Sequence, residues 1–156
     1  MSTRLFTVLC LCTGNSTRSI MAEAIVNYLV PARFRAYRAR SHPQGTGHPY
    51  ALDTLRHFQY HTHRLRSKSW EELTGRDAPR IDVVITLCDG AANEPCPLWL
   101  GHPVTFHWGL PDPAAVEGNA EATRLAFLET FESLQPRLAS WIPLLNAAVD
   151  RLIQSP

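Results

Sequence analysis

Cys12 and Arg18 are separated by five residues in a polar loop that follows an apolar run at 5–11. The backbone N–H groups of such a loop and the positive end of the following helix attract a tetrahedral oxyanion, which Arg18 can bind through two hydrogen bonds. The same field favours the reactive thiolate of Cys12. We therefore expect Cys12 to attack an oxyanion held by the loop residues Thr13, Gly14, Asn15, Ser16, Thr17, Arg18 and Ser19.

The chain has four cysteines, at positions 10, 12, 88 and 96. In a reducing compartment cysteines are catalytic or metal-binding more often than they are joined in structural disulfide bonds. The spacings C-x-C and C-x₇-C do not match those of zinc knuckles, so we expect no bound metal. Cys10 lies within the apolar run, and we expect it to be packed in the core.

The composition is that of an ordinary globular protein, with 156 residues, 45% hydrophobic and 19% charged, and a net charge of +1. This charge gives no reason to expect binding to nucleic acid or to membranes. No apolar run approaches the length that spans a bilayer. We expect a cytoplasmic monomer.

Strands and helices alternate along the chain. Apolar patterns predict strands at 5–11, 33–39, 81–87 and 104–107, and helices over 20–29, 49–58, 69–75 and 120–152. Pro136 and Pro143 should kink or divide the last helix. The alternation predicts one α/β domain over residues 1–156, a three-layer sandwich in which a four-stranded parallel sheet carries helices on both faces.

Several segments carry a resemblance to a known family: 11–24, 66–70, 86–89, 96–97 and 107–113. Together they resemble the low-molecular-weight protein tyrosine phosphatases and the arsenate reductases built on the same fold. Within that group the sequence is most similar to the arsenate reductases. The resemblance implies a substrate of arsenate, with phosphate or sulfate as an analogue.

The resemblance to thioredoxin-coupled arsenate reductases implies a relay of three thiols, carried by Cys12, Cys88 and Cys96. Cys88 follows the predicted third strand, and the carboxyl ends of parallel strands share one crevice. Cys96 follows a polar segment and could carry the disulfide to the surface. No cofactor is expected, because the reducing equivalents come from thioredoxin or from another thiol donor such as glutathione with glutaredoxin.

Asp112, between two prolines, is the candidate general acid for a departing oxygen. In the phosphatases of this group the Asp-Pro pair tends to be followed by aromatic residues, whereas here Ala114 and Ala115 follow, which favours the reductase. A phosphatase acting on phosphotyrosine or another phosphomonoester is the alternative. A non-enzymatic oxyanion sensor is a third possibility.

Some relatives hold a potassium ion behind the loop, and two of its ligands match Asn15 and Glu23. The other two positions are changed, to Arg38 and Lys68. We expect the Lys68 ammonium to substitute for the ion and support the loop. Arg38 and Arg40 end the second strand, where they either add positive potential for substrate capture or are solvated edge charges.

Overall fold

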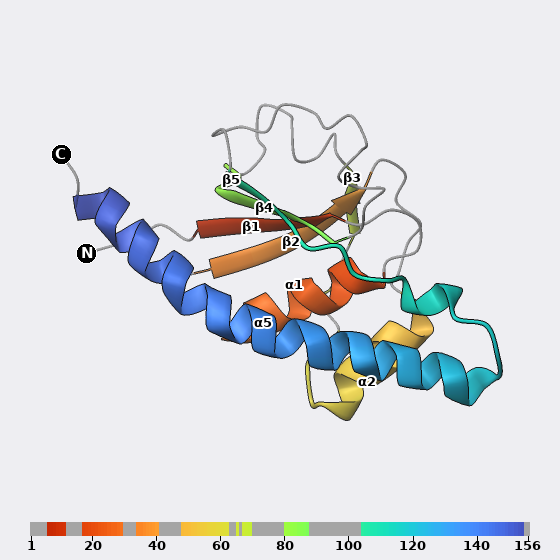
Figure 1. Cartoon of the computed structure of the whole chain (residues 1–156). Helices are drawn as coiled ribbons and strands as arrows, with labels where there is room; N and C mark the ends of the chain where they lie inside the picture. The colour runs from red at the N-terminus through yellow and green to blue at the C-terminus, as the bar shows by residue number, and fades with distance from the viewer. Residues whose placement is uncertain are drawn as a thin grey trace.

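The computed structural model describes residues 6–11, 17–29, 34–40, 48–62, 65, 67–69, 80–87 and 104–154. Of residues 39–40, 67–69, 146 and 148–154 it describes the backbone only. Strands and helices alternate through most of these ranges (Figure 1). In chain order they are β1 (Phe6–Leu11), α1 (Arg18–Leu29), β2 (Phe34–Arg40), α2 (Pro49–His57), β3 (Ser67–Ser69), β4 (Val83–Thr86), β5 (Val104–His107), the 3₁₀ helix η1 (Pro113–Ala115) and α5 (Ala120–Gln154).

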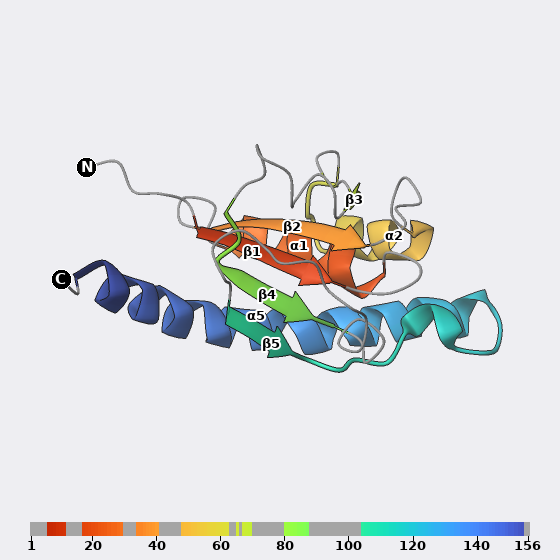
Figure 2. The same ribbon diagram turned by 90° about the horizontal axis from the view of Figure 1, so that it is seen from above.

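The strands form one parallel sheet in the order β3-β2-β1-β4-β5. Figure 2 shows β2, β1, β4 and β5 side by side, with β1 between β2 and β4. The four predicted strands are all present, and β3 adds a fifth short one at the edge. Ser69, predicted to begin a helix over 69–75, is instead the last residue of β3, and the rest of that predicted helix lies outside the described residues.

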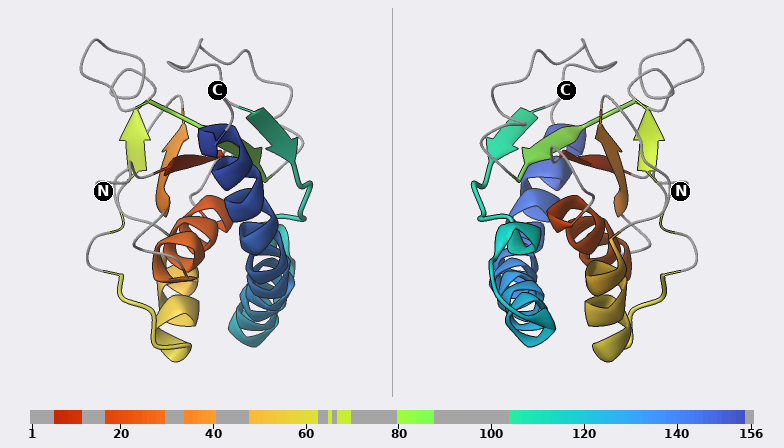
Figure 3. Two further views of the ribbon diagram at one scale, coloured as in Figure 1. Left: turned by 90° about the vertical axis from the view of Figure 1, so that its left-hand side faces the viewer. Right: turned by 90° about the vertical axis from the view of Figure 1, so that its right-hand side faces the viewer.

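The described helices α1, α2 and α5 lie on one side of the sheet, where α1 packs on β1 and β2, and α2 and α5 pack on α1 (Figure 3). Strand residues that point to this face form the core with them, for example Val8 on β1 and Ile85 on β4. Alternate residues point to the opposite face, where Leu9 is also fully buried. A strand that is buried on both faces reads as a continuous apolar run, which is why β1 and β4 were predictable.

Helix α5 is continuous over 35 residues and passes through both Pro136 and Pro143, so of the two predicted effects, a kink or a division, the division does not occur. Each proline removes a backbone hydrogen bond and costs a helix about 3 kcal/mol. Buried apolar side chains on both sides of Pro136 offset this cost by holding the helix in the core against α1 and α2, namely Phe127, Phe131, Leu134, Leu138 and Ile142. Leu125, an apolar residue near the start of the same helix, is 51% exposed. Among the helices that the structure describes, none combines the length and the apolar character needed to cross a bilayer.

Candidate active site

Three chain segments meet at the carboxyl edge of the sheet. The Leu87 backbone N–H donates to the Leu11 carbonyl at 2.9 Å, and the Leu110 N–H donates to the Leu87 carbonyl at 3.0 Å. In the sequence Cys12 directly follows Leu11, and Cys88 directly follows Leu87. The two predicted redox cysteines therefore follow neighbouring points of adjacent strands, whose axes are about 4.8 Å apart. Cys12, Cys88 and Cys96 themselves lie outside the described residues, as do Thr13, Gly14, Asn15 and Ser16.

Arg18 is the first residue of α1, and its side chain is 6% exposed. Its Nη1 donates to the Leu110 carbonyl at 2.8 Å, and its Nη2 lies 3.9 Å from Oδ2 of Asp112. The buried Nε has no hydrogen-bond partner among the residues that the structure describes. An oxyanion in the loop would supply one, because a guanidinium binds such anions through adjacent N–H groups. Ser19, the next loop residue, is also buried.

Asp112 connects the segment after β5 to the end of the predicted oxyanion loop. Its Oδ1 accepts from the Thr17 hydroxyl at 3.3 Å and from the Ala114 backbone N–H at 3.0 Å. The second contact makes Asp112 the N-cap of η1, whose first residue is Pro113. With 34% of its side chain exposed, Asp112 is reachable from solvent and is also held against Arg18. The predicted anion binder and the predicted general acid thus lie together.

A second pair of charges lies between α1 and β2. Glu23 Oε1 is 3.6 Å from Nε of Arg38, and both side chains are buried, at 5% and 1% exposure. Arg38 is therefore neither a solvated edge charge nor exposed for substrate capture. Because residues alternate along a strand, it shares the inner face of β2 with Phe34 and Ala36.

Lys68 was predicted to be the cation in this place. Its backbone pairs with Ala39 in the β2–β3 ladder, but its side chain lies outside the description, so its role stays a prediction. The role of Glu23 in supporting the loop also stays a prediction, because residues 12–16 lie outside the description. The sequence reasoning missed its contact with Arg38, which the period-two pattern of β2 could have indicated.

Cys10 is fully buried in β1. Burial, and secondarily the negative charge of Glu23, raise the pKa of its thiol well above the ordinary value of 9.0. A thiol that stays protonated is a poor nucleophile. The prediction that Cys10 is packed in the core is confirmed. Among the described residues no group of three potential metal-ligating side chains is found.

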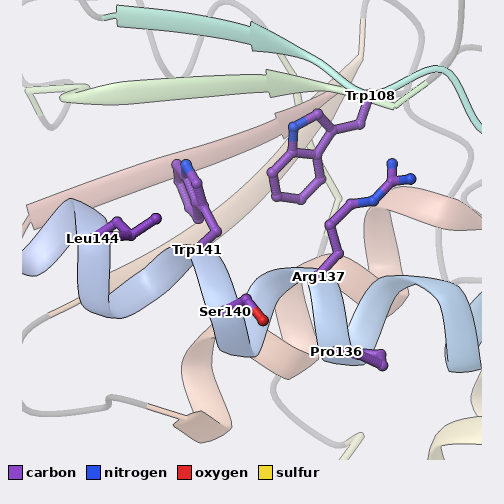
Figure 4. Close-up of a pocket in the computed structure, with 6 residues that line it drawn as sticks. All are labelled: Trp108, Pro136, Arg137, Ser140, Trp141 and Leu144. Atoms are coloured by element: carbon purple, nitrogen blue, oxygen red, sulfur yellow. The ribbon is translucent and has the colours of Figure 1, made fainter.

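Trp108, the residue after β5, packs against helix α5. Its ring lies 5.5 Å from that of Trp141 in an edge-on arrangement, and the guanidinium of Arg137 lies 5.8 Å from its centroid. Figure 4 shows these side chains around a shallow hollow that Ser140 and Leu144 also line. The backbone N–H of Trp108 also donates to the Thr86 carbonyl at 2.7 Å. Trp108 thus fixes the start of the segment after β5 to both α5 and β4.

A sequence model of the family described as low molecular weight phosphotyrosine protein phosphatase matches residues 7–153. The chain belongs to this family. It is 32% identical over 129 residues to an arsenate reductase of Shouchella clausii, covering 82% of this chain and 88% of that protein.

Solved structures of members of the group have the same fold. An arsenate reductase in the phosphate binding state is 26% identical with a TM-score of 0.60, covering 85% of this chain and 98% of that one. A thioredoxin-dependent arsenate reductase of Corynebacterium glutamicum is 18% identical with a TM-score of 0.67, covering 95% of this chain and 65% of that one. At this identity the second likeness shows the fold alone.

Proposed function

We propose that this phosphatase-family chain is an arsenate reductase in which Cys12 is the nucleophile. The observation that carries the proposal is the hydrogen bond of 2.9 Å between Leu87 and Leu11, because each of these residues immediately precedes a cysteine. A hydrolase of this family needs one nucleophilic cysteine, whereas reduction of arsenate needs two electrons and so a second thiol. The Shouchella clausii relative, which is named an arsenate reductase, supports the same function.

The first step forms a bond between Cys12 Sγ and arsenic. The Cys12 thiolate displaces one arsenate oxygen, which leaves as water after it takes a proton from Asp112. Arg18 neutralises the remaining oxygens through its guanidinium. The arsenic is still As(V) in the resulting thiol adduct.

The second step transfers the electrons. The Cys88 thiolate attacks Cys12 Sγ, so that a disulfide forms and the sulfur–arsenic bond breaks. The electron pair of that bond stays on arsenic, which leaves as As(III) in arsenite. The two thiols together have lost the two electrons that arsenic has gained.

Regeneration of Cys12 requires a third thiol. Cys96 attacks Cys88 Sγ and releases the Cys12 thiolate, and a dithiol partner then reduces the Cys88–Cys96 disulfide. Thioredoxin is the partner we propose, because a protein dithiol of this kind reduces a disulfide by thiol–disulfide exchange. The cytoplasmic location and the monomeric state remain predictions.

Phosphatase activity is the alternative, and the pairing of Arg18 with Asp112 favours it equally. These two residues and Cys12 are sufficient to hydrolyse a phosphomonoester through a cysteinyl-phosphate. Since Cys88 has no part in hydrolysis, a Cys88→Ser variant separates the two functions.

The test measures arsenite formation with thioredoxin, thioredoxin reductase and NADPH, beside hydrolysis of p-nitrophenyl phosphate. We expect the wild type to form arsenite, and Cys88→Ser to lose that activity while any hydrolysis is retained. Cys10→Ala is the matched control, because it removes a buried cysteine that the mechanism does not use. Absence of arsenite from the wild type with thioredoxin and with glutaredoxin as donors would refute the proposal.

A further inference from the structure

The segment 108–112 connects the edge strand β5 to η1 and brings two groups to Arg18. The Leu110 carbonyl accepts from Nη1 of Arg18 at 2.8 Å, and Oδ2 of Asp112 lies 3.9 Å from Nη2. The buried Nε, which has no hydrogen-bond partner among the described residues, is the donor that an oxyanion would use. The Leu110 carbonyl therefore helps to set the orientation in which the guanidinium meets an anion.

Backbone hydrogen bonds hold this segment along one side. The Trp108 N–H donates to the Thr86 carbonyl at 2.7 Å, and the Leu110 N–H donates to the Leu87 carbonyl at 3.0 Å. In the part of the sheet that the structure describes, β5 pairs with β4 and no strand pairs with its other edge. An edge strand lacks the second row of hydrogen bonds that holds a central strand in the plane of the sheet. The tilt of the segment relative to that plane must then be fixed by side-chain packing.

Helix α5 supplies this packing. Phe106 and Trp108 alternate along an extended chain, so their side chains lie on the same face. The ring of Trp141 lies edge-on to both, 5.4 Å from the ring of Phe106 and 5.5 Å from that of Trp108. The guanidinium of Arg137 lies 5.8 Å from the centroid of the Trp108 ring (Figure 4). Edge-on aromatic pairs and contacts between a cation and a ring each favour one orientation of the ring.

We propose that Trp141 and Arg137 of α5 are positioning residues for Arg18. They hold the ring of Trp108 and thereby the Leu110 carbonyl, two residues further along the chain. This inference rests on the proposed role of Arg18 in binding the oxyanion. Without the anchor on α5 the segment would be free to tilt, and Arg18 would meet an anion from a less defined orientation. Binding is weaker in that case, because the orientation must then be fixed during binding.

Pro136 directly precedes this anchor in the chain. Arg137 and Trp141 are four residues apart and so lie next to each other on one face of the helix. They can reach the ring of Trp108 because α5 continues through Pro136 instead of ending there. Arg137 is exposed and Trp141 is half-buried, so the anchor lies at the surface, beside the fully buried side chains that hold α5 in the core. Variants at these two positions should therefore fold.

A purely structural role for the anchor must be distinguished, because the loss of any contact can lower stability. Leu138 lies between the two anchor residues in the sequence and is fully buried. Leu138→Ala should lower the melting temperature more than a change at the surface does. If Trp141 acts through stability alone, its variants and Leu138→Ala should all leave the phosphate affinity of the folded protein unchanged. A positioning role instead predicts a loss of affinity for the change at Trp141 and not for the change at Leu138.

The experiment measures phosphate affinity by calorimetry and the melting temperature of each variant. We expect Trp141→Leu to bind phosphate about fivefold more weakly, a factor within the range that one aromatic pair can contribute. Trp141→Phe keeps an aromatic ring at this position and should bind within about twofold of the wild type. Leu144→Ala is the matched control and should keep the wild-type affinity, because Leu144 lines the same hollow and is 69% exposed.

Arg137→Gln provides an independent variant. It should bind phosphate about twofold more weakly, as expected for the loss of an exposed contact between a cation and a ring. The titrations are made at about 0.3 M salt, where the Debye length is about 6 Å and the long-range effect of the lost charge is largely screened. Arg124→Gln is the control, since it removes an exposed arginine about 20 Å away along the axis of the same helix.

Unchanged phosphate affinity in Trp141→Leu overturns the inference, as does an equal loss of affinity in Leu138→Ala or in Trp141→Phe. Should Trp141→Leu not fold, unchanged affinity in Arg137→Gln overturns it. None of these readouts requires arsenate reduction. A wild type that binds no phosphate would refute the oxyanion site at Arg18 and this inference with it, whereas a wild type that binds phosphate but forms no arsenite would refute the reductase alone.

Discussion

Replacement of Asp112 by asparagine removes one charge and one transferable proton while it preserves the shape of the side chain. The amide oxygen can still accept from Ala114 and from Thr17, so the start of η1 and the contact with the loop are retained. Two things are lost: the proton for the departing oxygen, and the negative charge 3.9 Å from Nη2 of Arg18.

The structure sets the expected magnitudes for Asp112→Asn. Because the carboxylate is 34% exposed, its ion pair with Arg18 should contribute no more than about 1 kcal/mol to stability. Loss of a general acid typically lowers the rate by about 10²–10⁴-fold, and we expect kcat for arsenate to fall in this range. In a water-like dielectric, the charges of Arg18 and Asp112 at 3.9 Å attract each other by about 1 kcal/mol, and a bound anion has to compete with this attraction. The phosphate affinity of Asp112→Asn should therefore be about fivefold higher than that of the wild type.

The assay combines steady-state arsenite formation, phosphate calorimetry and thermal unfolding. Asp53→Asn is the matched control, because it removes an exposed carboxylate that pairs with Arg56 far from the site in sequence. Asp112→Ala should in addition lose about 0.5–2 kcal/mol of stability, since it removes the N-cap. A wild-type kcat in a correctly folded Asp112→Asn variant would refute the assignment of Asp112 as the acid.

Three further outcomes are expected. Cys10 keeps its proton to higher pH in the folded protein than in the unfolded chain. The free energy of unfolding of the wild type should therefore be constant below about pH 9 and fall above it by up to about 1.4 kcal/mol per pH unit. In urea titrations at several pH values Cys10→Ala should lack this fall, and the same pH dependence in both proteins would contradict the prediction. Leu138→Ala removes a fully buried side chain beside Pro136 and should cost about 2–5 kcal/mol in the free energy of unfolding, whereas truncation of the 69%-exposed Leu144 should cost little. Thr17→Val removes the hydroxyl that donates to Asp112, so we expect kcat for arsenate to fall about fivefold, and an unchanged kcat would show that this hydrogen bond does not hold the acid.

The elements that could be predicted from the sequence are those in which the pattern of apolar side chains reflects which faces are buried. Strands β1 and β4 are apolar runs because both their faces are buried, and the structure confirms them within two residues of the predicted ends. Strand β3 was missed because Ser67–Ser69 contains no apolar residue, and only backbone pairing with β2 makes it a strand. The continuity of α5 was missed for the opposite reason, because burial of its apolar side outweighed the local effect of two prolines.

The candidate site likewise contains one contact that could be predicted from the sequence and one that could not. The contact between Arg18 and Asp112 agrees with the role that residue type and spacing predict for Arg18 and with the role that the family resemblance implies for Asp112. The pairing of Glu23 with Arg38 depends on which face of β2 packs against α1, a tertiary property that a loop motif does not contain. The prediction for Lys68 did not include this pairing of Arg38 with Glu23.

The central claim is that Cys12 and Cys88 exchange electrons with arsenic as direct neighbours. The measurement is a single turnover of reduced Cys96→Ser protein with excess arsenate and no thiol donor, followed by arsenite quantification and disulfide mapping. We predict one arsenite per chain and a Cys12–Cys88 disulfide, because the relay stops where its third thiol is missing. No arsenite and fully reduced thiols, or arsenite formed without that disulfide, would contradict the account.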